Sequence, residues 1–181
     1  MKRGRDLLHF VIAIVILLGL YGLIEGGEDD LFSKKGIQSI KNKKAPNFSL
    51  KGLNGEKVEL KSFKGKVVFL NFWATWCGPC KEEMPSMEAL YQQFQERNFF
   101  FLTISVDDEG REKVQEFIDK YHYTIPVLLD PKCETLDLYD VKRIPTTIII
   151  DKKGMMIGKA TGPMNWKKPE VISFLNLLLE K

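Results

Sequence analysis

Apolar residues in this chain fall either into unbroken runs or into stripes with helical spacing. Residues 66–73 and 99–106 are nearly continuous runs of strand-forming residues, which is typical of strands that are buried on both faces. Between these runs the apolar positions recur at i, i+3, i+4 and i+7. This spacing predicts a helix through Met87, Leu90, Tyr91 and Phe94.

Strands and helices continue to alternate along the rest of the chain. The same helical spacing returns at two places: Val114, Phe117, Ile118 and Tyr121, then Val171, Phe174, Leu175 and Leu178. Shorter elements are predicted at 126–130 (strand), 133–139 (helix) and 146–151 with 155–160 (hairpin). An N-terminal β-hairpin is predicted over residues 47–60, because Asn54-Gly55 is a strong turn signal. The pattern predicts an α/β domain with a mixed central β-sheet flanked by helices.

The N-terminal segment has a different character. Residues 7–24 carry no formal charge and are long enough, as a helix, to nearly span a bilayer. Basic residues precede the run and acidic residues follow it. We therefore expect a cytoplasmic stub at 1–6, a transmembrane signal anchor at 7–24, a polar linker at 25–44 and the folded domain at 45–181. A cleaved signal peptide is the alternative, although no A-x-A-like site follows the run. Both interpretations place the chemistry outside the cytoplasm, and the first predicts a single-pass protein of the cell membrane.

Composition and charge exclude some classes of protein. The chain has 181 residues, 44% of them hydrophobic and 28% charged, which argues against disorder. Of the net charge of +3, the first six residues contribute +2, through Lys2, Arg3 and Arg5 against Asp6. The remainder is nearly neutral, so no nucleic-acid partner is expected. With only three cysteines, the chain cannot build a disulfide scaffold.

The candidate chemistry lies in the sequence WCGPC. A buried strand runs directly into this motif and a helix runs out of it, so Cys77 falls at a helix N-terminus. There the unpaired N–H groups and the helix dipole favour the thiolate and lower the pKa of a cysteine. Cys80 lies on the same helical face, one turn deeper. One exposed nucleophile with one shielded partner is the arrangement of a redox pair.

Three alternatives use the same cysteines. A structural zinc site would combine Cys77, Cys80, Cys133 and His122, but the chain lacks a second paired knuckle. A purely structural disulfide would close so short a loop that it would stabilise little. Haem attachment would require a histidine at position 81, which is lysine.

Four motifs carry a resemblance to a known family: APNFSL, FLNFWATWCGPCKEEMP, ISVD and IPTTIIID. With them, residues 45–181 resemble thioredoxin-fold thiol-disulfide oxidoreductases of the membrane-anchored TlpA/ResA type, within the AhpC/TSA-related redoxins. The resemblance implies a thioredoxin-like fold, Cys77 as the attacking cysteine and Cys80 as the resolving one. It also implies a substrate-binding surface: Trp76 beside the disulfide, Ile144 and a cis Pro145 opposite it, and Gly162 in the neighbouring loop.

One position departs from general thioredoxins. They place a buried Asp six residues before the first cysteine, and here that position is Asn71, which cannot titrate. In the TlpA/ResA-type group an acid stands three residues after the second cysteine, and Glu83 matches it. One hypothesis is that Glu83 tunes the pair and shuttles its proton. The other is that Glu83 belongs to an exposed acidic cluster that merely favours the helix dipole.

The resemblance implies a membrane-tethered protein-disulfide reductase. Its expected clients are exported protein disulfides, with apocytochrome c favoured, and its electrons would come from a membrane thiol carrier. No cofactor or metal is expected, and the domain is expected to be monomeric. The alternatives are a disulfide-forming oxidant, a metallochaperone and a thiol peroxidase, although the Thr-x-x-Cys arrangement of peroxidases is missing because position 74 is alanine. Cys133 is expected to be a bystander thiol, and His122 a surface residue.

Overall fold

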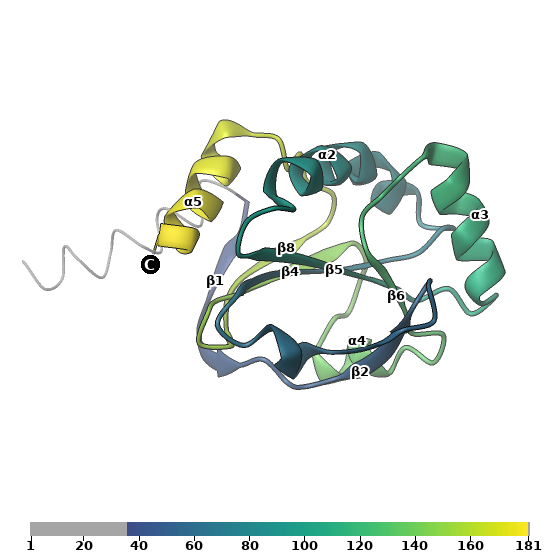
Figure 1. Cartoon of the computed structure of the whole chain (residues 1–181), viewed down its shortest axis with the longest axis horizontal. Coiled ribbons are helices and arrows are strands. Elements are labelled where there is room, and N and C mark those ends of the chain that lie inside the picture. Colours follow the sequence, from purple (N-terminus) through teal and green to yellow (C-terminus); the bar gives the residue numbers. More distant parts are fainter. Residues whose placement is uncertain (1–35, 181) are drawn as a thin grey trace, which may run out of the picture.

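A single mixed β-sheet organises the computed structural model, which describes residues 36–180 (Figure 1). Within these residues the sheet has eight strands in the order β1-β8-β7-β4-β5-β6-β2-β3. Their bounds are β1 Gln38–Lys44, β2 Ser49–Gly52, β3 Lys57–Glu59, β4 Val67–Trp73, β5 Phe99–Ser105, β6 Val127–Leu129, β7 Thr146–Ile150 and β8 Met155–Thr161. Strands β4, β5 and β6 are parallel, and the other pairings are antiparallel.

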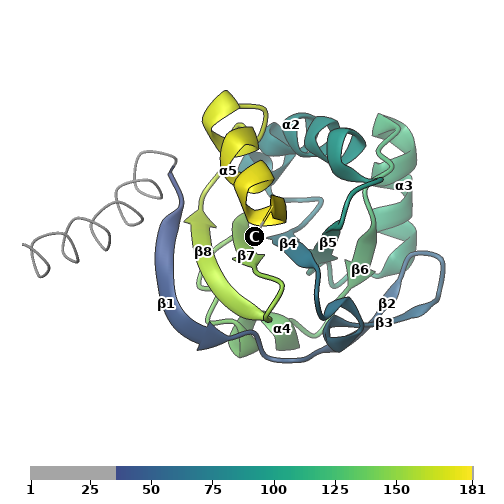
Figure 2. The same cartoon turned by 60° about the vertical axis from the view of Figure 1, so that its left-hand side comes forward.

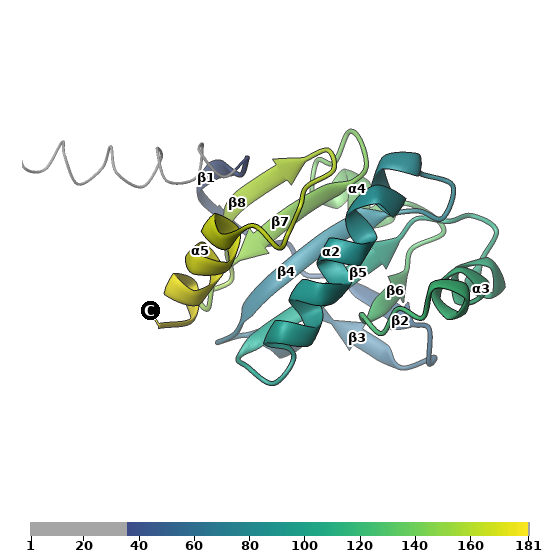
Figure 3. The same cartoon turned by 90° about the horizontal axis from the view of Figure 1, so that it is seen from above.

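Helices cover both faces of this sheet. They are the 3-10 helix η1 (Leu60–Phe63) and the α-helices α2 (Gly78–Phe94), α3 (Arg111–Tyr121), α4 (Glu134–Leu138) and α5 (Pro169–Glu180). Helices α2 and α5 lie over one face and α4 under the other (Figure 1). Seen from above, α2 crosses the sheet over β4 and β5 (Figure 3). The mixed sheet with flanking helices confirms the predicted fold class.

The burial of each strand follows from its place in the sheet. All seven residues of β4 are buried, as the unbroken apolar run predicts for a central strand that is covered on both faces. Strand β8 instead alternates between partly buried and buried positions, because one of its faces is only lightly covered. Aromatic rings fill the space under α2 and α5, where Phe69 packs against Phe101 and Trp166 with ring centroids 4.7 Å apart in both pairs.

The predicted N-terminal hairpin is present as β2 and β3. Its turn contains Gly55, whose φ of 86° lies in the region that favours glycine, and Asn54, whose side chain accepts a hydrogen bond from the Glu56 amide. Strand β2 also pairs with β6, so the hairpin extends the sheet.

The predicted linker at 25–44 is wrong at its C-terminal end, because residues 38–44 form strand β1. This strand pairs antiparallel with β8 at the edge of the sheet (Figure 2). The lysine-rich sequence resembles a solvated tether, but an edge strand tolerates polar side chains because only its backbone must pair. Ile37, which is 1% exposed, anchors the start of the strand in the core. The folded domain therefore begins before Ala45.

The remaining N-terminal predictions, for the stub at 1–6, the anchor at 7–24 and most of the linker, fall outside the described residues. None of the helices within residues 36–180 combines the length and the apolar character that a membrane span requires.

Candidate active site

The two cysteines of the CGPC motif form a disulfide at the start of α2. The Cα atoms of Cys77 and Cys80 are 5.3 Å apart. Cys77 is the N-cap residue of the helix, with an extended backbone, and its sulfur accepts a hydrogen bond of 3.2 Å from the Cys80 amide. Pro79 lies in the first turn, where its missing N–H is not needed. The helix N-terminus thus points at the sulfur of Cys77 and would stabilise a thiolate there.

Exposure differs between the two cysteines in the predicted direction, but the difference is small. Cys80 is fully buried and Cys77 is only 6% exposed, so the prediction of an openly exposed nucleophile is wrong. The adjacent Trp76 is the exposed residue of the motif, at 61%. A large exposed aromatic side chain beside a nearly buried sulfur suits a surface that closes against a partner.

The residues predicted to face a substrate lie on the neighbouring part of the sheet. The Ile144–Pro145 peptide bond is cis, as the resemblance implied. It precedes β7, whose first residue Thr146 pairs with Phe72 near the end of β4, and β4 leads into the CGPC motif. Gly162 has a φ of 92° and donates a backbone hydrogen bond of 2.9 Å to the Pro145 carbonyl. The cis-proline segment and the glycine loop therefore lie together.

Glu83 is buried, so the hypothesis of an exposed acidic cluster does not hold for this residue. It is 2% exposed, whereas its neighbour Glu82 lies in solvent. Its carboxylate accepts hydrogen bonds from the Asn71 side-chain amide (2.9 Å), the Met164 backbone amide (3.0 Å) and the Trp166 indole (3.2 Å). These partners come from β4 and from the loop after β8.

Burial raises the pKa of Glu83 to about 7. Loss of hydration is the largest cause, because it penalises the charged carboxylate. The three donated hydrogen bonds oppose it by stabilising the ionised form, but they offset only part of the rise. Glu83 follows Cys80 by three positions on the same helix, so the two side chains share a face. A carboxyl group that titrates near neutral pH is well suited to exchange a proton there.

Asn71 takes the place of the buried Asp of thioredoxins and binds the new acid instead. Its amide donates one hydrogen bond to Glu83 and one of 2.9 Å to the Thr147 hydroxyl. Asn71 is fully buried, and within the described residues its side-chain oxygen has no hydrogen-bond partner. In this chain the titratable carboxyl therefore lies on helix α2, and strand β4 supplies a neutral donor to it.

Three contributors to the site were not predicted from the sequence. Met164 and Trp166 bind the Glu83 carboxylate from a loop more than 80 positions away along the chain. The sequence pattern around Glu83 does not predict such a contact. Asp107 binds the loop just before Cys77, and its signal was available as the final residue of ISVD. An open depression between the first turns of α2 and the loop at 163–167 is lined in part by Glu83 and Met164.

The four residues of the alternative zinc site do not come together. Cys77 and Cys80 are joined to each other, and Cys133 is a free, half-buried cysteine at the start of α4. His122 is exposed at the C-terminal end of α3, as predicted. Across residues 36–180, no three His, Cys, Asp or Glu side chains are placed to hold a metal ion together.

Comparison with known sequences identifies relatives over nearly the whole chain. Residues 42–158 match the AhpC/TSA family. The thiol-disulfide oxidoreductase ResA of Bacillus cereus is 42% identical over 164 residues, which cover 90% of this chain and 91% of the relative. The thioredoxin-like protein YneN of Bacillus subtilis is 40% identical over 160 residues, covering 88% of this chain and 94% of that protein.

Solved structures agree on the fold. A putative thiol:disulfide interchange protein DsbE from Chlorobium tepidum superposes with a TM-score of 0.71 at 31% identity, covering 78% of this chain and 99% of its own. StoA from Bacillus subtilis has a TM-score of 0.61 at 28% identity, covering 70% of this chain and 95% of its own. The predicted thioredoxin-like fold is confirmed.

Proposed function

We propose, from the premise that this chain belongs to the thioredoxin-like AhpC/TSA family and is a thiol-disulfide oxidoreductase, that it reduces disulfides of exported proteins outside the cytoplasm. The observation that carries the proposal is the Cys77–Cys80 disulfide at the N-terminus of α2, with the buried Glu83 carboxyl one turn further on. The favoured client is apocytochrome c, whose haem-binding cysteines must be reduced before haem is attached.

The first step is attack by the Cys77 thiolate on one sulfur of the client disulfide. A mixed disulfide forms between Cys77 and the client, and the second client sulfur leaves as a thiolate, which takes up a proton from water. The N-terminus of α2 stabilises the attacking anion. We expect Trp76, Ile144, Pro145 and Gly162 to bind the client chain beside Cys77, with the Ile144 backbone pairing in strand fashion.

The second step is carried by Cys80 and Glu83. The ionised Glu83 carboxylate takes the proton of the Cys80 thiol, and the Cys80 thiolate attacks the sulfur of Cys77. The remaining client sulfur leaves and accepts the proton from Glu83. The client gains two electrons and becomes a dithiol, while Cys77 and Cys80 return to the disulfide. A pKa of about 7 allows Glu83 to accept and release this proton at neutral pH.

The cycle then requires a reductant. We expect a membrane thiol carrier to reduce the Cys77–Cys80 disulfide by the same two exchange steps in reverse. The hydrophobic run at 7–24 supports a membrane anchor that would hold the catalytic domain, on the extracytoplasmic face, close to such a carrier.

A synthetic peptide with an oxidised C-x-x-C-H sequence provides the test. The reduced protein should convert it to the dithiol in a one-to-one reaction, and a Cys77→Ser variant should not. In a Cys80→Ser variant the peptide should remain attached to Cys77, because the resolving thiol is missing. A reduced protein that leaves the peptide oxidised while it reduces other protein disulfides would rule out this client. A protein that reduces neither would rule out the reductase function.

A further inference from the structure

We propose that Asp107 is a positioning residue for thiol-disulfide exchange, because its buried carboxylate holds the loop that carries Trp76 and Cys77. The inference rests on the exchange reaction at Cys77 and does not depend on which client is reduced.

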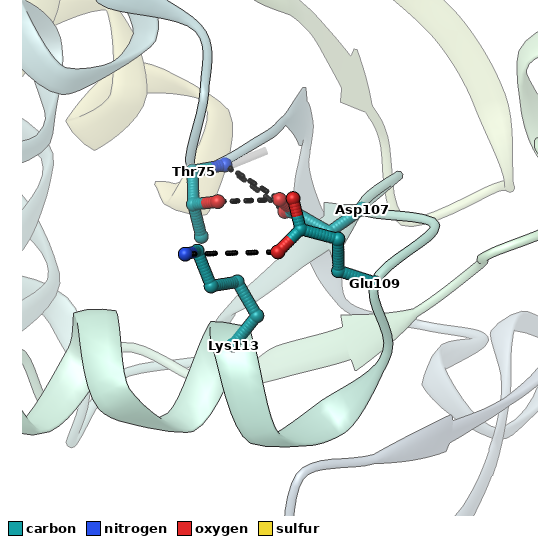
Figure 4. Close-up of polar contacts among 4 residues, drawn as sticks. All are labelled: Thr75, Asp107, Glu109 and Lys113. Atoms are coloured by element: carbon teal, nitrogen blue, oxygen red, sulfur yellow. Dashed lines mark hydrogen bonds and ion pairs between the residues drawn. The ribbon is translucent and has the colours of Figure 1, made fainter.

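The carboxylate of Asp107 accepts hydrogen bonds from both the backbone amide and the side-chain hydroxyl of Thr75 (Figure 4). The Thr75 backbone amide donates to both carboxylate oxygens, at 2.9 and 3.1 Å, and the Thr75 hydroxyl donates to Oδ1 as well. The Ser105 hydroxyl donates a further hydrogen bond of 2.7 Å to Oδ2 and helps to fix the orientation of the carboxylate. Asp107 is 3% exposed and Thr75 is 8% exposed, so water has little access to these bonds.

The topology explains why these residues meet. Strands β4 and β5 are parallel, and Trp73 at the end of β4 is paired with Ser105 at the end of β5. The Val106 amide extends the pairing with a hydrogen bond of 3.0 Å to the Trp73 carbonyl. Asp107, the next residue along the chain, therefore reaches the short loop by which β4 passes into α2. Along the chain, only Ala74 lies between Trp73 and Thr75, and only Trp76 lies between Thr75 and Cys77.

Burial of the carboxylate makes this contact stronger than an ordinary loop hydrogen bond. A buried charge is very costly unless hydrogen bonds compensate it. Within residues 36–180 no basic side chain forms an ion pair with Asp107. The nearby Lys113 pairs instead with Glu109, at 3.6 Å (Figure 4). Most of the compensation therefore comes from Thr75. If the loop moved outward, the charge would lose these donors, and this penalty keeps the loop in place.

The position of the loop that contains Thr75 determines where the reactive sulfur of Cys77 lies. Cys77 benefits from the N-terminus of α2 only while its sulfur stays near the helix amides, as in the 3.2 Å hydrogen bond from Cys80. Trp76, exposed at 61%, is placed mainly by the backbone on either side of it. A loosened Thr75 would free both residues. The thiolate of the reduced protein would then lose stabilisation, and Trp76 would lose its fixed orientation towards a partner.

The chain contains a matched control for this contact. Asp130 is also a buried carboxylate. It accepts hydrogen bonds from the amide and the hydroxyl of one threonine, Thr135, and a further one of 3.2 Å from the Glu134 amide. That contact holds the start of α4 and touches no residue of the active-site loop. Thr75→Val and Thr135→Val each remove one hydroxyl from a buried carboxylate. Both are expected to lower stability, but only Thr75→Val should alter the chemistry of Cys77.

The experiment measures the rate at which iodoacetamide alkylates Cys77 in the reduced full-length protein as a function of pH. We expect Thr75→Val to slow alkylation at pH 7 about tenfold, through a thiol pKa raised above that of the wild type. Thr75→Ser, which restores the hydroxyl, should recover the wild-type pH profile, and Thr135→Val should retain it. Asp107→Asn, whose neutral amide binds Thr75 more weakly, should shift the profile in the same direction as Thr75→Val.

Two results would overturn the proposal. One is a wild-type pH profile in folded Thr75→Val or, should that variant fail to fold, in Asp107→Asn. The other is an equal shift in Thr135→Val, which would show that the profile follows general stability. Since no client takes part, these results stay distinct from the failure of the peptide reduction described above.

Discussion

Replacement of Glu83 by glutamine isolates the titration of one buried carboxyl group. The side chain keeps its size and its place between α2 and the loop after β8, but it can no longer ionise. In the wild type, the folded protein holds the Glu83 proton up to about pH 7, whereas the unfolded chain releases it near 4.5. Folding is therefore coupled to proton uptake in the range between these two values.

The sign and the size of this effect follow from the raised pKa. The proton contributes its full stabilisation below pH 4.5, and the contribution is lost as the pH rises through about 7. At about 1.4 kcal/mol for each pH unit, the wild type should lose about 3 kcal/mol over this range through Glu83 alone. The glutamine variant lacks this loss. The free energy of unfolding of the wild type, relative to the variant, should thus fall by about 3 kcal/mol from pH 4.5 to pH 8.

Urea denaturation of the oxidised protein at a series of pH values measures this difference directly, provided that the m-value stays constant. Glu82→Gln is the control, because Glu82 is the adjacent glutamate and is exposed. The stability of this variant as a function of pH should run parallel to that of the wild type. In the reduced protein, Glu83→Gln should also slow the resolution of a mixed disulfide about 100-fold near neutral pH. Parallel stability curves for Glu83→Gln and the wild type would refute the raised pKa, and an unchanged resolution rate would refute the catalytic role.

Three other substitutions test the surroundings of this carboxyl group and the core beneath it. Trp166→Phe keeps an aromatic ring against Phe69 but removes one donor to the carboxylate. This substitution should raise the pKa of Glu83 further. In the same denaturation series, the pH range over which stability is lost should then extend to higher pH. Asn71→Asp places a second acid at the position from which Asn71 now donates a hydrogen bond of 2.9 Å to Glu83. Above neutral pH, the free energy of unfolding of this variant should fall below that of the wild type by about 3 kcal/mol or more. Leu90→Ala empties a position that is 1% exposed and should cost about 2–5 kcal/mol in urea denaturation at any pH.

The fold was largely predictable because its central strands are buried on both faces. An unbroken apolar run has few explanations other than a central strand, and β4 meets that expectation at every residue. Strand β1 was missed for the opposite reason. Its side chains are mostly polar, and it exists because the backbone of β8 offers hydrogen bonds at an open edge. Hydrophobic periodicity carries no signal for a strand that is held in this way.

In the active site, features that depend on local sequence were predictable, whereas contacts between distant parts of the chain were not. The position of Cys77 at a helix N-terminus follows from a strand-to-helix junction that is visible in the sequence. The burial of Glu83 does not, because the residues that cover it, Met164 and Trp166, come from a distant loop. Asp107 is an intermediate case. Its position after a buried parallel strand placed it at the edge where β4 also ends, but only the structure shows that it binds Thr75.

The direction of electron flow is the central claim, and the reduction potential of the Cys77–Cys80 pair tests it most directly. The protein would be equilibrated with glutathione or dithiothreitol buffers of defined potential, and the fraction of disulfide measured by thiol alkylation. A reductant supplied by a membrane thiol carrier should have a potential near or below about −270 mV, the value of thioredoxin. A potential near about −120 mV would contradict the account, because a pair with that value withdraws electrons from its clients and forms their disulfides.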